Sequence, residues 1–172
     1  YQVLLFLEAA RMMKLTMPKD VLFAIVSYLP VPQIIGEMKT KPTQYAVRTL
    51  NSAGIQPDFI IARSVRELDE KRKEKLGIFC NISKDDVISA PDVKSIYDIP
   101  INFEKDGLGH RILEKFGLKP RKNDLAEWTA MVKKIKSAKR QVNIGIVGKY
   151  FSTGDFTLAD SYISVIEAIK HA

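Results

Sequence analysis

Cysteine and histidine are scarce in this chain. Its 172 residues include one cysteine, Cys80, and two histidines, His110 and His171. A disulfide within the chain needs two cysteines and is therefore excluded. Cys80 lies in the largely apolar run 77–82, where we expect a buried, unreactive thiol. Neither histidine has Cys, Asp or Glu at metal-ligand spacing, so we predict no metal site in these residues.

Long hydrophobic runs are also missing. No apolar run approaches the roughly 18 residues that cross a bilayer, and the first residues lack the basic start and cleavage site of a signal peptide. We therefore expect a cytoplasmic protein with no membrane partner. The chain opens on Tyr1 rather than Met, and we expect it to be a fragment of a longer polypeptide.

Acidic residues are outnumbered, with 20 Asp and Glu against 27 Lys and Arg and a net charge of +7. Such an excess suits an anionic partner. Eight of the cations lie between residues 119 and 141, where only Asp124 and Glu127 oppose them. A nucleic-acid-binding segment would interleave aromatic residues, and this one has only Trp128. We therefore predict a solvated basic linker and no nucleic-acid partner.

Helical and strand-like segments alternate along the first part of the chain. This alternation predicts an α/β protein in which a mostly parallel sheet lies between two layers of helices. Such three-layer proteins bind ligands at the carboxyl ends of their strands. Gly54 and Gly77 are expected to end two of the helices, and both early strands are expected to be buried. The predicted order is helix 4–13, strand 21–28, helix from 44, strand 58–63, helix 67–76 and strand 87–89.

The pattern changes in the second part. Between residues 100 and 118, Gly107 and Gly109 interrupt a helical pattern and predict two short helices packed on the sheet edge. A further helix is expected over 124–137, with Trp128 anchoring it against a domain. A strand over 142–150 and a helix over 160–172 then look like the beginning of a new α/β domain. The predicted domains are residues 1–118, a linker 119–141, and 142–172.

The most informative segment is GEMKTKPTQ at residues 36–44. Alternate residues of an extended segment point to one side, so Lys39 and Lys41 can present two ammonium groups to a triphosphate-sized anion. Thr43 is expected to cap a helix whose amino end adds positive potential. Arg63 and Asp92 fall at strand ends, although Arg63 could instead pair with Glu67 or Asp69, and Asp92 could be an ordinary turn residue.

These segments together resemble the CTP synthases, glutamine-dependent ligases that aminate UTP to CTP with ATP. The resemblance covers nearly the whole chain. It implies the later part of an amidoligase domain of the P-loop NTPase and dethiobiotin-synthetase-like class, followed by the start of a class I glutamine amidotransferase domain. The matching motifs after GEMKTKPTQ are GIQPD at 54–58, RS at 63–64, FCN at 79–81, VIS at 87–89, DV at 92–93, SIYDIP at 95–100, IGIVGKY at 144–150 and DSYISVIEA at 160–168.

The resemblance also implies site residues. Residues for UTP and its competitor CTP would be Lys39, Thr40, Lys41, Pro42, Thr43, Gln44 and Lys75. Residues for ATP would be Arg63, Pro91, Asp92 and Val93. It implies no catalytic residue and no metal ligand in these residues, because no GxxxxGK[ST] phosphate loop occurs and the glutaminase Cys and His are expected beyond Ala172. This chain alone is therefore expected to be inactive.

For the family, the implied chemistry is phosphorylation of the uracil 4-oxygen by ATP with Mg²⁺, then attack by glutamine-derived ammonia. GTP is an expected allosteric effector and a homotetramer the expected assembly. Two alternatives stay open. One is a non-catalytic remnant that senses pyrimidine nucleotide or assembles into filaments, and the other, disfavoured by where the charge lies, is a basic nucleic-acid-binding module.

Overall fold

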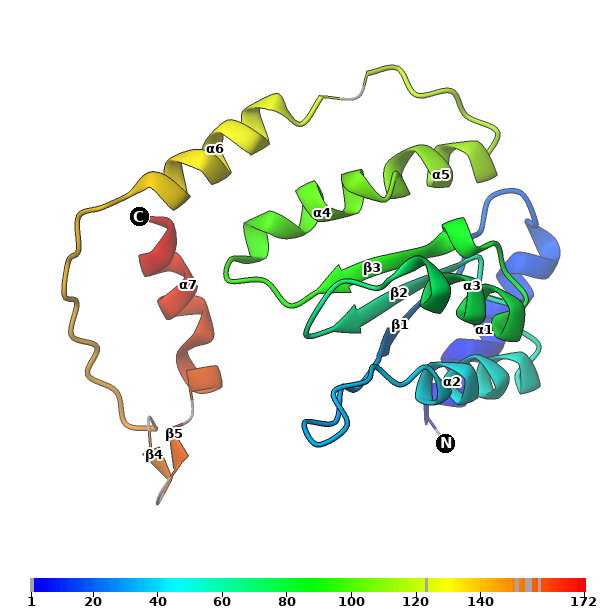
Figure 1. Ribbon diagram of the computed structural model, residues 1–172, viewed down its shortest axis with the longest axis horizontal. Coiled ribbons are helices and arrows are strands. Elements are labelled where there is room, and N and C mark those ends of the chain that lie inside the picture. Colours follow the sequence, from blue (N-terminus) through cyan, green and yellow to red (C-terminus); the bar gives the residue numbers. More distant parts are fainter. Residues whose placement is uncertain (1, 123, 151, 154–155, 158) are drawn as a thin grey trace. The chain divides into compact units, whose positions relative to one another are not determined.

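Three parallel strands form the sheet of the first of two structural units, Tyr1–Lys136 (Figure 1). The computed structural model describes residues 2–122, 124–150, 152–153, 156–157 and 159–172. The strands are β1 (Ala24–Tyr28), β2 (Phe59–Ser64) and β3 (Val87–Pro91), in the order β1-β2-β3. Ile60 is paired with Ile25 on one side and Val87 on the other. The predicted α/β class with a parallel sheet is confirmed.

Helices lie on both faces of this sheet. Ile60 and Ala62 of β2 belong to one buried cluster with Val47 and Leu76 of the helices α2 and α3. Residues 59 and 61 point to the opposite face, where the Lys115 ammonium lies 5.1 Å from the centre of the Phe59 ring. The helices of this unit are α1 (Gln2–Thr16), α2 (Lys41–Ser52), α3 (Glu70–Cys80), α4 (Ile99–Lys105), α5 (Leu108–Lys115) and α6 (Ala126–Ser137). Short 3₁₀ turns are η1 (Lys84–Asp86) and η2 (Ile96–Asp98).

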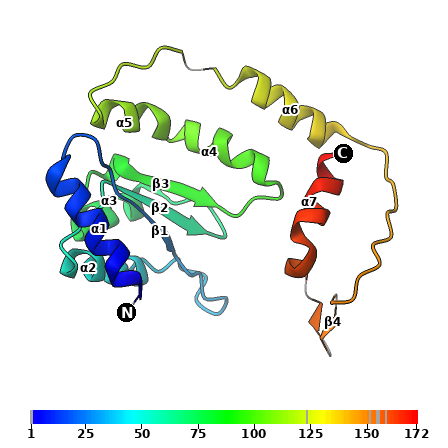
Figure 2. The same cartoon turned by 180° about the vertical axis from the view of Figure 1, so that it is seen from behind.

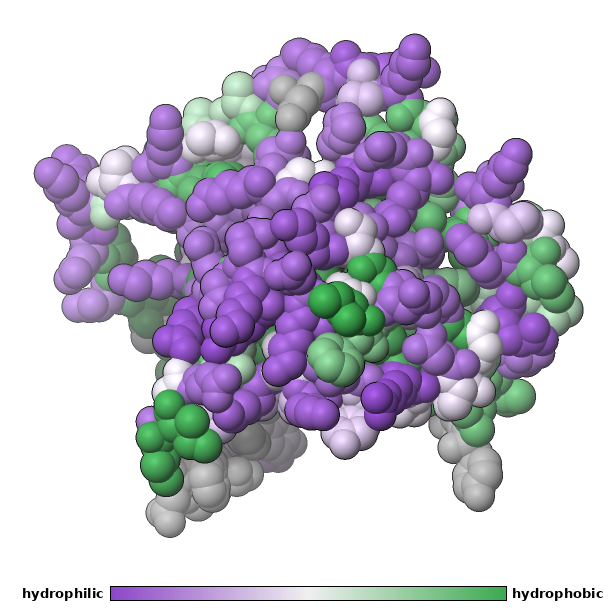
Figure 3. Space-filling model, turned by 45° about the vertical axis from the view of Figure 1, so that its right-hand side comes forward, coloured by the Kyte–Doolittle hydropathy of each residue, from purple (hydrophilic) through white to green (hydrophobic). Residues whose placement is uncertain are grey.

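The expectation that β1 is buried is wrong. Its side chains alternate, and Val26 and Tyr28 are 65% and 52% exposed. β1 is an edge strand, and α2 covers one of its faces. Helix α1 lies beside the amino ends of the strands (Figure 2). Its Leu5 and Phe6 side chains are 75% and 77% exposed. The face shown in Figure 3 is largely hydrophilic, with hydrophobic side chains between the polar ones.

Two predicted helix boundaries are also wrong. The helix α2 begins at Lys41 rather than after a Thr43 cap, because Pro42 fits the first turn of a helix, where its missing N–H leaves no bond unmade. Gly77 lies inside α3 instead of ending it. A Cβ at Gly77 would lie 3.0 Å from the Ile82 carbonyl oxygen, so glycine serves close packing there. The helix ends at Asn81, which takes the left-handed conformation.

Gly107 breaks the helical pattern as predicted, whereas Gly109, also predicted to break it, lies inside α5. The Gly107 φ of +68° separates α4 from α5, and α4 packs beside the edge strand β3. The next predicted helix is α6. The Trp128 indole N–H donates to the Tyr97 carbonyl oxygen at 2.9 Å, and the Lys136 ammonium lies 2.6 Å from Asp98. Trp128 therefore anchors this helix, as expected.

The second unit, Ser137–Ala172, lacks the strand predicted over 142–150. Val142 and Val147 are 80% and 101% exposed, and no strand in the described ranges pairs with this segment. An apolar run forms a strand only where its backbone finds a partner. The predicted helix is present as η3 (Ala159–Tyr162) and α7 (Ile163–His171). Ser152–Thr153 and Phe156–Thr157 form the short antiparallel pair β4 and β5, between residues that lie outside the described part. Over the described ranges, no helix is both long and apolar enough to cross a membrane.

Cys80 is buried, as predicted, and gives a test of the core. It is 2% exposed, and desolvation raises the pKa of its thiol from 9.0 to about 11, against a weaker opposing effect of the Arg48 charge. The unfolded chain ionises first as the pH rises, so this contribution to stability is complete below pH 9 and is lost progressively towards pH 11.

We therefore expect the wild-type chain to lose about 1 kcal/mol more of its free energy of unfolding than a Cys80→Ala variant between pH 8 and pH 10. Urea denaturation of both proteins at the two pH values measures this difference. Equal losses would show that the thiol is not desolvated.

Candidate functional site

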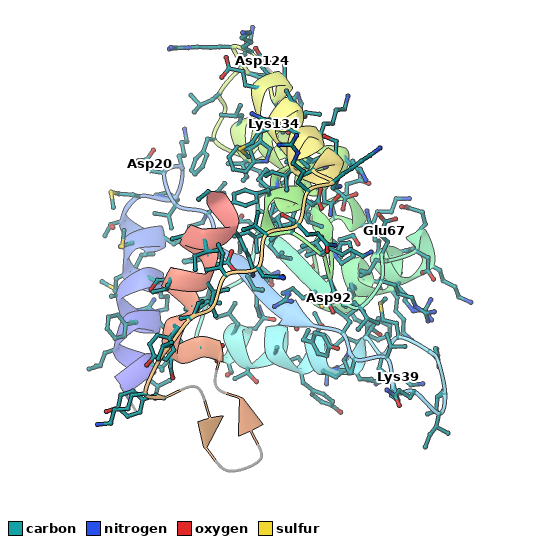
Figure 4. The ribbon with its side chains drawn as sticks, turned by 90° about the vertical axis from the view of Figure 1, so that its left-hand side faces the viewer. Asp20, Lys39, Glu67, Asp92, Asp124 and Lys134 are labelled. Carbon is teal, nitrogen blue, oxygen red and sulfur yellow. The ribbon has the colours of Figure 1, made fainter. Side chains whose placement is uncertain are left out.

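The predicted anion-binding loop lies at the carboxyl edge of the sheet. It follows β1, and the Lys39 backbone N–H donates to the Pro30 carbonyl oxygen at 2.9 Å. From the segment after β2, the Arg66 guanidinium donates to the Gly36 carbonyl oxygen at 2.5 Å. Figure 4 labels Lys39 on this loop and Asp92 after β3. The topology therefore brings the loop to the edge where parallel sheets bind ligands.

The loop residues that are predicted to bind UTP or CTP differ in their exposure to solvent. The side chains of Lys39 and Lys41 reach the surface, whereas Thr40, Thr43 and Gln44 are 5%, 0% and 3% exposed. The Thr43 hydroxyl lies 2.8 Å from the Ser27 hydroxyl of β1, and the Gln44 amide donates to the Thr40 hydroxyl at 3.2 Å. The buried polar groups thus fix the start of α2 against the sheet. The two lysines, in contrast, keep their side chains at the surface.

Helix α3 contributes further cations to the same loop. The Arg72 guanidinium donates to the Met38 carbonyl oxygen at 3.3 Å and lies 3.8 Å from the Glu37 carboxylate. Lys75 is three residues further along, which places it on the same side of the helix. Sequence reasoning did not single out Arg72. Its i, i+3 spacing to Lys75 was the signal available, but helical spacing alone cannot say which side of α3 meets the loop.

Glu37 lies among these cations. Its carboxylate accepts from the Lys39 ammonium at 2.6 Å. The hydrogen bond and charge of Lys39 lower the pKa of Glu37, and the charges of Arg72 and Lys75 lower it further. Glu37 is therefore ionised at neutral pH, and it neutralises part of the positive charge of the loop.

The residues that are predicted to bind ATP also lie close to one another in the structure. The Arg63 guanidinium at the end of β2 lies 3.1 Å from the Asp92 carboxylate after β3, and the Asp92 backbone N–H donates to the Ser64 carbonyl oxygen at 2.8 Å. Arg63 thus pairs with Asp92 rather than with the alternatives Glu67 or Asp69. Pro91 is the last residue of β3, and Val93 is half-buried beside it. Because Arg63 and Asp92 are about half exposed, their ion pair adds little stability and leaves both groups accessible.

A small pocket lies beside this turn, between β3, α3 and α4. Its volume is about 130 Å³, well below the several hundred Å³ of ordinary ligand sites. On its wall, the Asp106 carboxylate accepts from the Ser89 backbone N–H at 2.7 Å and pairs with Lys73 at 3.0 Å. These bonds hold the end of β3 against its helices. The pocket is therefore too small to enclose a nucleotide.

Across the part of the chain that the structure describes, no group of three or more Cys, His, Asp or Glu side chains could hold a metal ion. The candidate site thus consists of cationic side chains, the carboxylates of Glu37 and Asp92 that pair with some of them, and backbone turns. Its cationic groups suit phosphate oxygens.

A three-stranded parallel sheet with cationic groups at its carboxyl edge is typical of α/β domains that bind anionic ligands. The chain belongs to the CTP synthase N-terminus family, whose model matches residues 1–118. It is 46% identical over 168 residues to the CTP synthase of Thermococcus gammatolerans and 46% identical over 168 residues to that of Pyrococcus abyssi. The CTP synthase of Methanococcus maripaludis is 45% identical over 168 residues. Each comparison covers 97% of this chain, which spans 30–31% of the length of these relatives.

Proposed function

We propose that this chain is part of a CTP synthase, the ligase that aminates UTP with ATP and glutamine-derived ammonia. In this proposal the loop after β1 binds the triphosphate of UTP or its competitor CTP, and the turn after β3 binds ATP. The proposed pyrimidine residues are Lys39, Thr40, Lys41, Pro42, Thr43, Gln44 and Lys75, and the proposed ATP residues are Arg63, Pro91, Asp92 and Val93.

One observation carries the proposal. Three segments that are far apart in the sequence meet at one edge of the sheet: the loop after β1, the end of β2 and the turn after β3. Two nucleotides that exchange a phosphoryl group have to lie next to each other. Sites on neighbouring strand ends satisfy that requirement, and the family membership of the chain supports the assignment of the ligands.

The residues of this chain would act through charge and position. Negative charge on the transferring phosphoryl oxygens and on the UTP triphosphate would be stabilised by the ammonium groups of Lys39, Lys41 and Lys75. Buried Thr40, Thr43 and Gln44 would keep the loop in place by fixing its junction with α2. The described residues offer no set of metal ligands, so we assign no step to Mg²⁺ here.

The proposed domain boundaries place the amidoligase part at residues 1–118, the linker at 119–141 and the start of the glutaminase domain at 142–172. The similarity to the Thermococcus gammatolerans CTP synthase extends over 97% of the chain and so includes residues from all three proposed parts, which supports this assignment. GTP as an effector, a homotetramer and a cytoplasmic location are further parts of this proposal.

The proposed ATP contact is tested in the Thermococcus gammatolerans enzyme after this segment replaces its matching residues. We expect Arg63→Ala to raise the ATP concentration for half-maximal CTP formation about tenfold, because one charge-assisted hydrogen bond contributes about 1.5 kcal/mol. The UTP requirement should stay within about twofold. The rate of CTP formation is followed by absorbance while ATP and UTP are varied separately.

Arg48→Ala is the matched control, because Arg48 is exposed on α2 and its guanidinium lies against the Tyr45 ring, not at the strand ends. If Arg63→Ala and Arg48→Ala leave the ATP requirement equally unchanged, the ATP assignment of Arg63 fails.

A further inference from the structure

Glu37 is the acidic residue within the cationic loop, and its carboxylate lies where an anionic ligand would be expected. The Lys39 ammonium lies 2.6 Å from one of its oxygens, and the Arg72 guanidinium lies 3.8 Å from the other. Both cations therefore already have an anionic neighbour that is supplied by the chain itself.

A triphosphate cannot form all of its possible hydrogen bonds with the Lys39 ammonium while the Glu37 carboxylate is bonded to it. The ligand oxygens would compete with the carboxylate for the same ammonium hydrogens, and the two anions would repel each other at close range. Glu37 is 56% exposed at its side chain, so nothing in its packing prevents it from turning away. The backbone bonds Lys39 N–H to Pro30 and Arg66 to Gly36 do not involve the Glu37 side chain and would keep the loop in place.

We propose that Glu37 is a displaceable internal counter-ion of the triphosphate site, which a ligand has to displace from Lys39. This inference rests on the proposed function. It assigns Glu37 a role in setting affinity: the residue weakens binding of every anion that uses Lys39 and so disfavours anions that make too few other contacts to displace it.

Removal of the charge is therefore expected to tighten binding. Glu37→Gln keeps the size and hydrogen-bonding ability of the side chain while it removes the competing charge. Because exposed ion pairs are weak, the expected gain in UTP affinity at low salt is modest, about fivefold. The gain should shrink as salt screens the charges.

The test measures binding of labelled UTP to the 172-residue chain by equilibrium dialysis. It compares wild type, Glu37→Gln, Lys39→Met and the double variant. Glu37→Gln should bind UTP about fivefold more tightly than wild type, and adding it to Lys39→Met should change little, because the competition acts through Lys39. Glu70→Gln is the matched control; Glu70 lies on α3 and faces Lys84 at 3.8 Å, so its change should stay within about twofold.

The outcomes separate the inference from the function on which it rests. If Lys39→Met weakens UTP binding but Glu37→Gln leaves it unchanged or weaker, the site stands and the counter-ion role is overturned, since Glu37 would then position Lys39 rather than compete for it. An equal gain from Glu37→Gln and Glu70→Gln would also overturn it, because net charge alone would explain the effect. If UTP does not bind, or binds equally well to Lys39→Met, the proposed pyrimidine site and the inference both fail.

Discussion

Loss of both loop lysines is expected to raise the UTP requirement of a CTP synthase that carries this segment by about 100-fold. In the Lys39→Met/Lys41→Met variant, methionine keeps the length of each side chain and removes its charge. Each charge-assisted hydrogen bond to phosphate contributes about 1.5 kcal/mol or more, and two of them correspond to about 100-fold. Inhibition by CTP should weaken in parallel, because in the proposed function the product uses the same residues. Initial rates at varied UTP, with and without CTP, measure both effects.

A Lys133→Met/Lys139→Met variant is the control for this experiment. It removes the same charge from exposed positions in and after α6. We expect less than a threefold change in the UTP requirement. Similar changes in the two double variants would mean that general electrostatic attraction, and not the loop, accounts for the effect. An unchanged UTP requirement in the Lys39→Met/Lys41→Met variant would refute the pyrimidine assignment.

The second large effect concerns the fold and not the site. Leu76→Ala is expected to lower the free energy of unfolding of this chain by about 3 kcal/mol. Leu76 is 0% exposed in the cluster that joins α3 to the sheet, and shortening it leaves a cavity that rigid neighbours fill only in part. Urea denaturation followed by circular dichroism measures the change, with the midpoint expected to fall while the slope stays constant.

Ile78→Ala provides a close control on the same helix. Ile78 is 73% exposed, so the same class of truncation two residues away should change the free energy of unfolding by less than about 0.5 kcal/mol. If the two variants were equally destabilised, α3 would not pack on the sheet through Leu76. That result would also undermine the placement of Lys75 and Arg72 beside the loop, because both depend on the orientation of this helix.

Parts of the fold could be predicted because local signals and burial agree there. The uninterrupted apolar run of β2 is covered by helices on both faces, so its composition matched its environment. The same reasoning failed for β1, where an equally apolar sequence lies at an edge and leaves Val26 exposed. It also failed for residues 142–150, because the propensity of an apolar run cannot reveal whether a neighbouring strand exists to pair with it.

For the candidate site, the sequence indicated which residue types matter but not their contacts. The loop composition and the predicted strand ends singled out Lys39, Lys41, Arg63 and Asp92. The resemblance implied their ligands, and those ligand roles stay predictions. The pairing of Arg63 with Asp92 could not be chosen over Glu67 or Asp69, since all three are reasonable partners by spacing. The sequence also could not show whether Glu37 belongs to the candidate site, because an acidic residue near a lysine is common on any protein surface.

The sequence by itself determined the family, the alternation of helices and strands in the first unit, and the concentration of cations in the loop around Pro42. These properties depend on residue type and local spacing, which a linear chain contains in full. Only the tertiary structure decided that α3 turns Arg72 towards that loop, that the Thr43 and Gln44 side chains point inward, and that Glu37 pairs with Lys39. Such relations depend on how buried surfaces orient whole elements against one another, and neighbouring residues in the sequence do not specify that orientation.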